Sequence, residues 1–297
     1  MRVFITGASG WIGAAAVDEL LTAGHTVLGL ARSDSSAAAL QHKGAEILRG
    51  DLDDHDALTR GANEADAVLH LANKHDWANP AESNRAERAA VSTLAEALVG
   101  SGKPFALASG LLLPRTGRAP VETDASIAEG PDSARGGSEN LALEYADRGV
   151  TSIALRFAPT VHGMHDHGFI SQIVAAARRT GVSGYVGDGT NAWAAVHRTD
   201  AARLARLALE QASAGARLHA VAEEGVPTRA IAEAIGDALG VKTTSIDPAD
   251  AVEHFGFIGG FFSAEMTASS AATRETYGWE PVGPTLIEDI ATGAYTK

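Results

Sequence analysis

Short apolar runs alternate with longer amphipathic stretches through the first half of the chain. The apolar runs fall at residues 2–7, 25–31, 45–51, 66–72, 104–110 and 151–159. The stretches between them predict helices near residues 11–23, 35–42, 54–61, 82–101 and 135–148. Because the apolar runs are continuous rather than alternating, they are typical of strands buried on both faces of a parallel sheet. The pattern therefore predicts right-handed βαβ units and a doubly wound α/β fold.

The regular alternation of apolar runs and amphipathic stretches ends at about residue 160. Amphipathic helices are expected at residues 168–181, 200–212 and 226–240, and no linker or repeat separates them from the first half. Glycine-rich and aromatic stretches lie between and after them, notably FGFIGGFF at residues 255–262. This stretch is as compatible with a loop packed on the core as with a substrate wall or a subunit contact.

Three glycines at three-residue spacing, Gly7, Gly10 and Gly13, follow the first apolar run and open the first helix. Gly7 allows a tight turn, Gly10 allows close approach of backbone to phosphate, and Gly13 allows close packing of helix on strand. Free N–H groups and the positive end of the helix dipole favour pyrophosphate there. The intervening residues Ser9, Trp11 and Ile12 are predicted to contact a dinucleotide with the glycines.

The end of the second strand indicates which dinucleotide binds. An NAD site places Asp or Glu there to accept from ribose hydroxyls, whereas this chain has Arg32 and Ser33, followed by Asp34. A guanidinium suits a 2′-phosphate. We therefore expect NADPH rather than NADH, although the carboxylate of Asp34 favours NADH.

Further cofactor contacts are expected after the third and fourth strands. Asp51 and Leu52 follow the third strand, where an adenine edge could be met, and Leu71 and Ala72 end the fourth strand.

Composition narrows the range of partners. The 297 residues carry 24 Lys and Arg against 37 Asp and Glu, a net charge of −13, which disfavours nucleic acid and anionic membranes. The chain has no cysteine, so thiolate chemistry is excluded. With no secretory signal and no apolar run of membrane-spanning length, a cytoplasmic enzyme with a small-molecule substrate is expected.

Several motifs together resemble the extended short-chain dehydrogenase/reductase superfamily, in its NAD(P)-dependent epimerase/dehydratase-like branch. They are TGASGWIG at 6–13, GDL at 50–52, HLA at 70–72, RFAPTVHG at 156–163, VHRTDAARL at 196–204 and YGWEP at 277–281. The resemblance implies a Rossmann domain of residues 1–160 and 192–220 and a smaller α+β substrate lobe of residues 161–191 and 221–297. It also implies a homodimer built on the helices near 82–101 and 135–148, and it places Pro159 and Val161 beside the nicotinamide.

The same resemblance implies a catalytic Ser, Tyr and Lys, and here the chain departs from it. None of its four tyrosines is followed four residues later by lysine. The positions that correspond to the pair hold Pro131 and Arg135, and the serine position is taken by Ser109 or falls on Gly110. Arg135 could hold the ribose hydroxyls, but a guanidinium is a poor proton donor at neutral pH.

A histidine is the most suitable substitute acid, because its ordinary pKa is close to neutral pH. His162 is ranked first because its loop follows the sixth strand, with His165 and His167 next, and His75 beside Lys74 and Asp76 after them. The stretch HGMHDHG also has metal-ligand residue types, but a flexible glycine-flanked loop explains it as well, and no metal is expected.

Three functions remain open on these observations. The first is an NADPH-dependent reductase of a ketone, aldehyde or imine that uses Ser109, Arg135 and His162. The second is a non-enzymatic NADP(H)-binding redox sensor, which the missing tyrosine favours. The third is a sugar-nucleotide epimerase or dehydratase, which the same missing tyrosine disfavours.

Overall fold

The computed structural model describes residues 1–76, 78–111, 113–114 and 116–296. Its centre is a parallel sheet of seven strands in the order β10-β6-β5-β4-β1-β2-β3. These strands are β1 (Arg2–Thr6), β2 (Thr26–Ala31), β3 (Glu46–Arg49), β4 (Ala67–His70), β5 (Pro104–Gly110), β6 (Thr151–Phe157) and β10 (Ala216–Ala220). The chain winds outward from β1 to β3 and then crosses to β4, so the carboxyl ends of β1 and β4 lie side by side at the point where the strand order reverses. The expectation of a doubly wound parallel sheet is confirmed.

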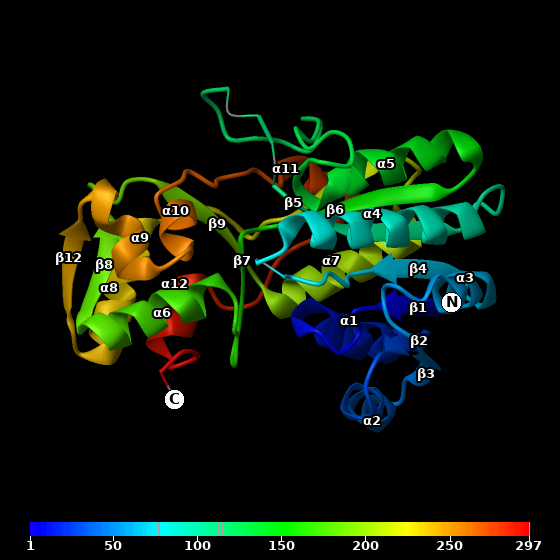
Figure 1. Cartoon of the computed structure of the whole chain (residues 1–297), viewed down its shortest axis with the longest axis horizontal. Helices are drawn as coiled ribbons and strands as arrows, with labels where there is room; N and C mark the ends of the chain where they lie inside the picture. The colour runs from blue at the N-terminus through cyan, green and yellow to red at the C-terminus, as the bar shows by residue number, and fades with distance from the viewer. Residues whose placement is uncertain (77, 112, 115, 297) are drawn as a thin grey trace.

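Helices cover both faces of this sheet (Figure 1). One face packs on α1 (Trp11–Thr22), α2 (Asp34–Lys43) and α7 (Arg198–Gln211). The other packs on α3 (His55–Glu64), α4 (Pro80–Ala97) and α5 (Ser138–Glu144). Each face encloses its own apolar core, which is why the strands read as continuous apolar runs.

A second, smaller lobe of strands and helices lies beside the first (Figure 1, left). It has a three-stranded sheet of β7 (Thr160–His162), β9 (Ala192–His197) and β11 (Glu223–Pro227), and a pair β8 (Val182–Val186) and β12 (Lys242–Ile246). Its helices are α6 (Phe169–Thr180), α8 (Thr228–Leu239), α9 (Ala251–Phe255), α10 (Ile258–Phe262) and α12 (Leu286–Ala291). The short helix α11 (Ala271–Tyr277) packs back toward α7. FGFIGGFF therefore forms the end of α9 and the whole of α10 rather than a loop.

Strand β9 joins the two lobes through alternating side chains. Ala194 and Val196 pack in the core beneath the large sheet, whereas Trp193 and Ala195 pack in the core of the second lobe. Successive residues of a strand point to opposite faces, so one strand serves both cores. The lobes are thus continuous in packing as well as in sequence.

The helix expected over residues 135–148 is interrupted. Residues 135–137 adopt left-handed φ values of 54°, 63° and 62° in the turn η1 (Ala134–Gly137), and regular helix begins only at Ser138. A second 3₁₀ turn, η2 (Tyr145–Arg148), ends the segment, and η3 (Pro248–Asp250) precedes α9. The two glycines explain the break, because a Cβ at Gly136 would lie 2.5 Å from the carbonyl oxygen of Asn84 on α4. The left-handed turn therefore presses the start of α5 against α4.

No helix among the described residues is both long and apolar enough to cross a membrane.

Candidate active site

The loop between β1 and α1 is shaped by its glycines. Gly7 has φ +69°, and a Cβ there would lie 2.7 Å from the backbone nitrogen of Ala72. A Cβ on Gly13 would lie 2.0 Å from the carbonyl oxygen of Gly7. The backbone at Gly7 and Gly13 therefore leaves no room for a side chain, as the sequence predicts. Ser9 and Gly10 are exposed at the start of α1. This cradle fits a dinucleotide pyrophosphate at a helix N-terminus.

The side chain of Trp11 links this loop to the second lobe. Its indole N–H donates to the carbonyl oxygen of Val161 at 2.7 Å. The guanidinium of Arg198 lies 4.4 Å from its ring centre, and the ring of His167 meets it edge-on at 5.7 Å. Trp11 therefore fixes the distance between the phosphate loop and strand β7. The neighbouring Ile12 packs against the first core.

At the end of β2 the predicted specificity residues are exposed. Ser33 is the N-cap of α2, and its hydroxyl accepts from the backbone N–H of Ser36 at 3.2 Å. Asp34 is paired with Arg49. Arg32 forms no hydrogen bond or ion pair with any described residue. The Asp34 carboxylate, which favoured NAD, therefore has a surface partner in Arg49, whereas the Arg32 guanidinium faces solvent beside a helix N-terminus.

The remaining predicted cofactor residues lie around the same edge of the sheet. The backbone N–H of Ala72 donates to the Thr6 hydroxyl at 3.3 Å, which holds the end of β4 against β1 next to Leu71. Asp51 closes a turn by accepting from Asp53 N–H at 2.9 Å, and Leu52 is buried in the second core cluster. Pro159 is half-buried between β6 and β7.

Arg135 is held at this edge by a buried carboxylate. Its Nη2 donates to Glu87 Oε1 at 2.5 Å and to the carbonyl oxygen of Ala108 at 2.9 Å. The other oxygen of Glu87 accepts from the Asn73 side chain at 2.8 Å. Glu87 is fully buried, whereas 27% of the Arg135 side chain is exposed. The guanidinium is thus anchored from behind and reaches the surface at the carboxyl end of β5.

His70 closes the back of this group. Its Nδ1 lies 2.8 Å from the hydroxyl oxygen of Thr6, and its Nε2 is 3.9 Å from Glu87 Oε1. Complete burial lowers the pKa of His70, with the positive charge of Arg135 acting in the same direction and Glu87 against it. A neutral imidazole there serves as packing and hydrogen-bonding support rather than as an acid.

Ser109 is directed inward. Its hydroxyl donates to Glu139 Oε2 at 2.5 Å, and only 9% of the residue is exposed. Glu139 in turn pairs with the fully buried Arg156 at 2.6 Å. Since a hydroxyl has one proton to donate, Ser109 in this arrangement cannot also donate to a substrate oxygen. Ser109 can therefore contact a substrate only by accepting a hydrogen bond, unless its side chain adopts another rotamer.

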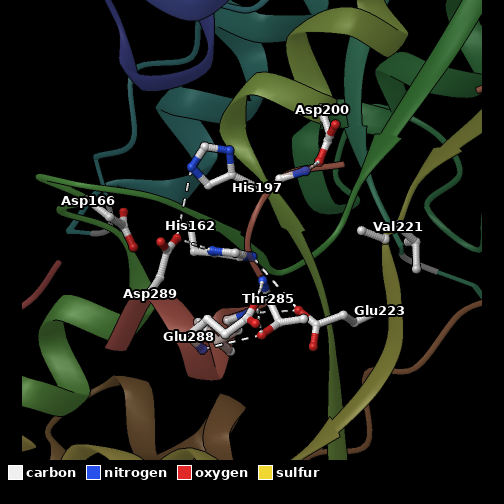
Figure 2. Close-up of polar contacts among 12 residues, drawn as sticks. His162, Asp166, His197, Asp200, Val221, Glu223, Thr285, Glu288 and Asp289 are labelled. Carbon is white, nitrogen blue, oxygen red and sulfur yellow. Dashed lines mark hydrogen bonds and ion pairs between the residues drawn. The ribbon is translucent and has the colours of Figure 1, made fainter. Parts of the chain in front are cut away.

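Figure 2 shows His162, which the sequence ranked first as proton donor. Its Nδ1 lies 2.6 Å from Asp289 Oδ2 on α12, and its Nε2 is 3.9 Å from Glu223 Oε2. The ring of His197 approaches it at 5.6 Å. His162 has no exposed surface. The structure therefore places it inside the junction between β7, β9 and α12, away from solvent.

Two functional candidates escaped the sequence reasoning, Glu87 and Asn73. Glu87 does leave a signal, because it shares a helical stripe with Ala90, Val91 and Leu94, all buried. A carboxylate inside an apolar stripe must be paired. Asn73 lies in a loop and offers no comparable pattern.

Three non-glycine residues among those described have positive φ, and each follows a strand that ends at or near this edge. They are His75 after β4 (φ 50°), Arg135 after β5 (φ 54°) and His165 after β7 (φ 69°). Backbone strain of this kind is concentrated at functional sites. The described residues hold no group of three or more His, Asp or Glu placed to bind a metal ion.

A cavity of about 310 Å³ lies elsewhere, between α4, α5 and the loop before η1. Arg88, Asn140 and Glu144 line it, and Ser109, Arg135 and His162 do not. It adjoins the helices on which the dimer was predicted, and a homodimer stays a prediction for this single chain.

The glycine cradle at the switch point of a doubly wound parallel sheet defines a dinucleotide-binding protein of the extended short-chain dehydrogenase/reductase class. Residues 3–221 match the model of the NAD dependent epimerase/dehydratase family, and the chain belongs to that family. It is accordingly an NAD(P)-dependent enzyme of the oxidoreductase and epimerase type.

The chain is also similar to curated relatives, and it shares its fold with solved structures. The uncharacterized protein YLL056C of Saccharomyces cerevisiae is 44% identical over 98% of both chains. A ketoreductase of Stigmatella aurantiaca that acts on a farnesylated dihydroquinoline oxide is 28% identical over 60% of this chain and 55% of its own. The dTDP-glucose 4,6-dehydratase DesIV of Streptomyces venezuelae superposes with a TM-score of 0.78 at 20% identity, covering 99% of this chain and 96% of its own.

Proposed function

We propose that this protein reduces an apolar ketone, aldehyde or imine with NADPH, using a catalytic edge that lacks the tyrosine and lysine of its superfamily. The reduced nicotinamide would supply the hydride when bound. The residues that would hold it are the 7–13 loop, Arg32 with Ser33, and Arg135. One observation carries the proposal: Arg135, which the family spacing aligns with the lysine, is anchored by Glu87 and by the carbonyl oxygen of Ala108 at the carboxyl end of β5.

NADPH is favoured by the charges at the end of β2. Arg32 faces solvent beside the first turn of α2, where the hydroxyls of Ser33 and Ser35 lie 3.0 Å apart. A guanidinium, hydroxyls and a helix N-terminus together suit a phosphate monoester. Asp34 would repel that phosphate if it were unpaired, and its pairing with Arg49 reduces this effect.

An apolar substrate is favoured by the surface of the second lobe nearest the phosphate loop. His167 contacts Trp11 and is followed within two residues by Phe169, whose ring stacks on Phe261 at 5.7 Å. Phe257 and Phe261 are 47% and 38% exposed. Rings held at such a surface bind flat apolar groups through burial and stacking.

A sugar nucleotide fits this surface less well, because its diphosphate calls for cations that are not otherwise engaged. Three arginines of the second lobe are engaged: Arg178 donates to the carbonyl oxygen of Tyr295, Arg179 to that of His254, and Arg229 pairs with Glu233. The exposed Lys242 on β12 has no such partner among the described residues. The ketoreductase relative is consistent with the same preference.

The test is NADPH oxidation followed at 340 nm with bulky ketones, aldehydes and cyclic imines, beside the same assays with NADH. Binding of each dinucleotide and of UDP-glucose is measured by calorimetry on the same preparation. We expect turnover with at least one apolar substrate, a preference for NADPH of at least about tenfold, and no binding of UDP-glucose. Tight NADPH binding with no turnover would favour the redox sensor. Tight UDP-glucose binding would favour an epimerase or dehydratase.

A further inference from the structure

With the tyrosine absent and His162 enclosed, the source of the proton must be sought among groups that reach the edge of the sheet. Lys74 is near this edge, but it is paired with Asp53 at 2.9 Å and with Glu82 at 3.5 Å. The carboxylate of Asp76 accepts from Asn79 at 2.9 Å. The hydroxyl of Ser109 is committed to Glu139. The histidines of the loops that follow β4 and β7 are the groups near this edge whose ordinary pKa suits proton transfer at neutral pH.

His75 is the one tied to the anchor of Arg135. Its backbone N–H donates to Asn73 Oδ1 at 2.8 Å. The same Asn73 side chain donates through Nδ2 to Glu87 Oε2, and Glu87 accepts from Arg135. One amide therefore fixes the backbone of His75 relative to the carboxylate that fixes Arg135.

The backbone of His75 is also held in a conformation it would not adopt freely. Its φ of 50° is one of three positive values outside glycine in the described residues, and Arg135 supplies another. A left-handed histidine costs free energy that the surroundings must offset. The Asn73 hydrogen bond supplies part of that offset, and it fixes the position of the His75 backbone in the loop.

We propose that His75 is the proton donor of the reduction, with Asn73 and Glu87 as its positioning residues. This inference rests on the proposed reductase function. The substrate carbonyl carbon accepts a hydride, with both electrons, from the reduced nicotinamide dinucleotide, and the carbonyl oxygen accepts a proton from the imidazolium of His75. The C=O group becomes CH–OH, the dinucleotide is left oxidised, and the neutral imidazole regains its proton from solvent.

The charges around His75 make the assignment testable without substrate. Desolvation lowers the pKa of His75, the nearby charge of Arg135 lowers it further, Glu87 raises it, and His167 lowers it. If the imidazole of His75 lies near Arg135 and Glu87, its pKa rises in Arg135→Gln and falls in Glu87→Gln. NMR titration of the imidazole protons of the cofactor-free protein measures both shifts, with the His75 signal assigned by its loss in His75→Gln.

His42→Gln is the matched control, since His42 is an exposed histidine near the far end of α2. It should change neither the titration nor the rate. A His75 pKa that is the same in Arg135→Gln, Glu87→Gln and the unmutated protein would overturn the assignment.

The kinetic arm compares His75→Gln with the unmutated protein on the best substrate of the carbonyl panel. We expect kcat to fall about 10²-fold, with the Kd for NADPH within about twofold of the unmutated value. In the unmutated protein kcat falls as pH rises through the measured pKa of His75, because the imidazolium is lost. That fall is absent in His75→Gln, and in Glu87→Gln it moves to lower pH.

The outcomes separate the two proposals. Full activity of His75→Gln, or a loss found only in His162→Gln, His165→Gln or His167→Gln, overturns the role of His75 and leaves the reductase intact. An unmutated protein that reduces no carbonyl overturns both.

Discussion

Glu87 at the edge of the large sheet and Asp289 inside the second lobe are both buried carboxylates that lie near a histidine. Both are well buried, with 0% and 10% of their side chains exposed, and both make a short contact to a basic group. They differ in what lies beyond that group. Behind Glu87 the neutral His70 closes the core, and in front Arg135 reaches the surface. Beside Asp289, His162 has no exposed surface, and 16% of the His197 side chain, 3.9 Å from the carboxylate, is exposed.

The difference teaches that burial of a carboxylate against a basic side chain does not by itself mark an active site. A buried pair whose cation is partly exposed can act on a ligand, whereas one that is enclosed on all sides contributes only to folding. The sequence could not distinguish the two pairs. Arg135 comes after β5 and His162 comes after β6, so both basic residues follow a strand of the large sheet. The separation predicts that mutations of the Asp289–His162 pair change stability and that mutations of the Glu87–Arg135 pair change catalysis.

The largest expected effect is on the stability of the second lobe. Asp289→Ala leaves Nδ1 of His162 without its partner, beside an Nε2 that already lacks a hydrogen bond. We expect the free energy of unfolding to fall by about 2–3 kcal/mol, with kcat per folded molecule unchanged. Urea denaturation followed by circular dichroism measures the first quantity. The exposed Glu253→Ala on α9 is the control and should change stability by less than about 0.5 kcal/mol.

Glu87→Gln should behave in the opposite way. The amide keeps the shape of the side chain and an acceptor for Arg135, so stability should fall by only about 1 kcal/mol. Loss of the negative charge frees the guanidinium to reorient, and we expect kcat/KM to fall about tenfold, or about 1.4 kcal/mol. Steady-state kinetics and urea denaturation on one preparation give both values. If Glu87→Gln lost stability and kept its activity, the contrast with Asp289 would disappear.

A third change tests whether the cofactor lies along this edge at all. Arg32→Ala should raise the KM for NADPH about tenfold and leave that for NADH within about twofold, since only NADPH carries the 2′-phosphate. Arg60→Ala, an exposed arginine on α3, serves as the control for a general loss of positive charge. Equal effects on both dinucleotides would remove the assignment of Arg32.

Much of this arrangement could be predicted from local pattern. The parallel sheet follows from the continuous apolar runs. The tight approach of α1 to β1 follows from Gly7 and Gly13, because a side chain at Gly13 would meet the backbone of Gly7 and one at Gly7 would meet the backbone of Ala72. The placement of Arg135 followed from a family spacing. Its left-handed backbone did not, because two glycines pressed against α4 decide it.

What the sequence could not supply are contacts between distant segments. The partner of His162 is 127 residues away on α12, and the partner of Arg135 is 48 residues away on α4. Only Glu87 left a trace, as a carboxylate in an apolar helical stripe. Ranking His162 above His75 rested on its position after a strand, and position along the chain carries no information on enclosure.

The smallest effect concerns residues 163–168, the loop between β7 and α6, whose His167 contacts Trp11 of the phosphate loop. Burial raises the pKa of Asp166 above its usual 3.8, although Gly168 N–H and the Tyr295 hydroxyl donate to its carboxylate. The folded state therefore binds this proton more tightly than the unfolded state. The resulting stability is fully present below pH 3.8 and is lost as pH rises through the folded-state pKa of Asp166. Asp166→Asn removes this dependence, so the difference in unfolding free energy between Asp166→Asn and the unmutated protein should change with pH only in that window. A difference that stays constant from about pH 4 to pH 7 would show that the loop carboxylate is as well stabilised as one in water.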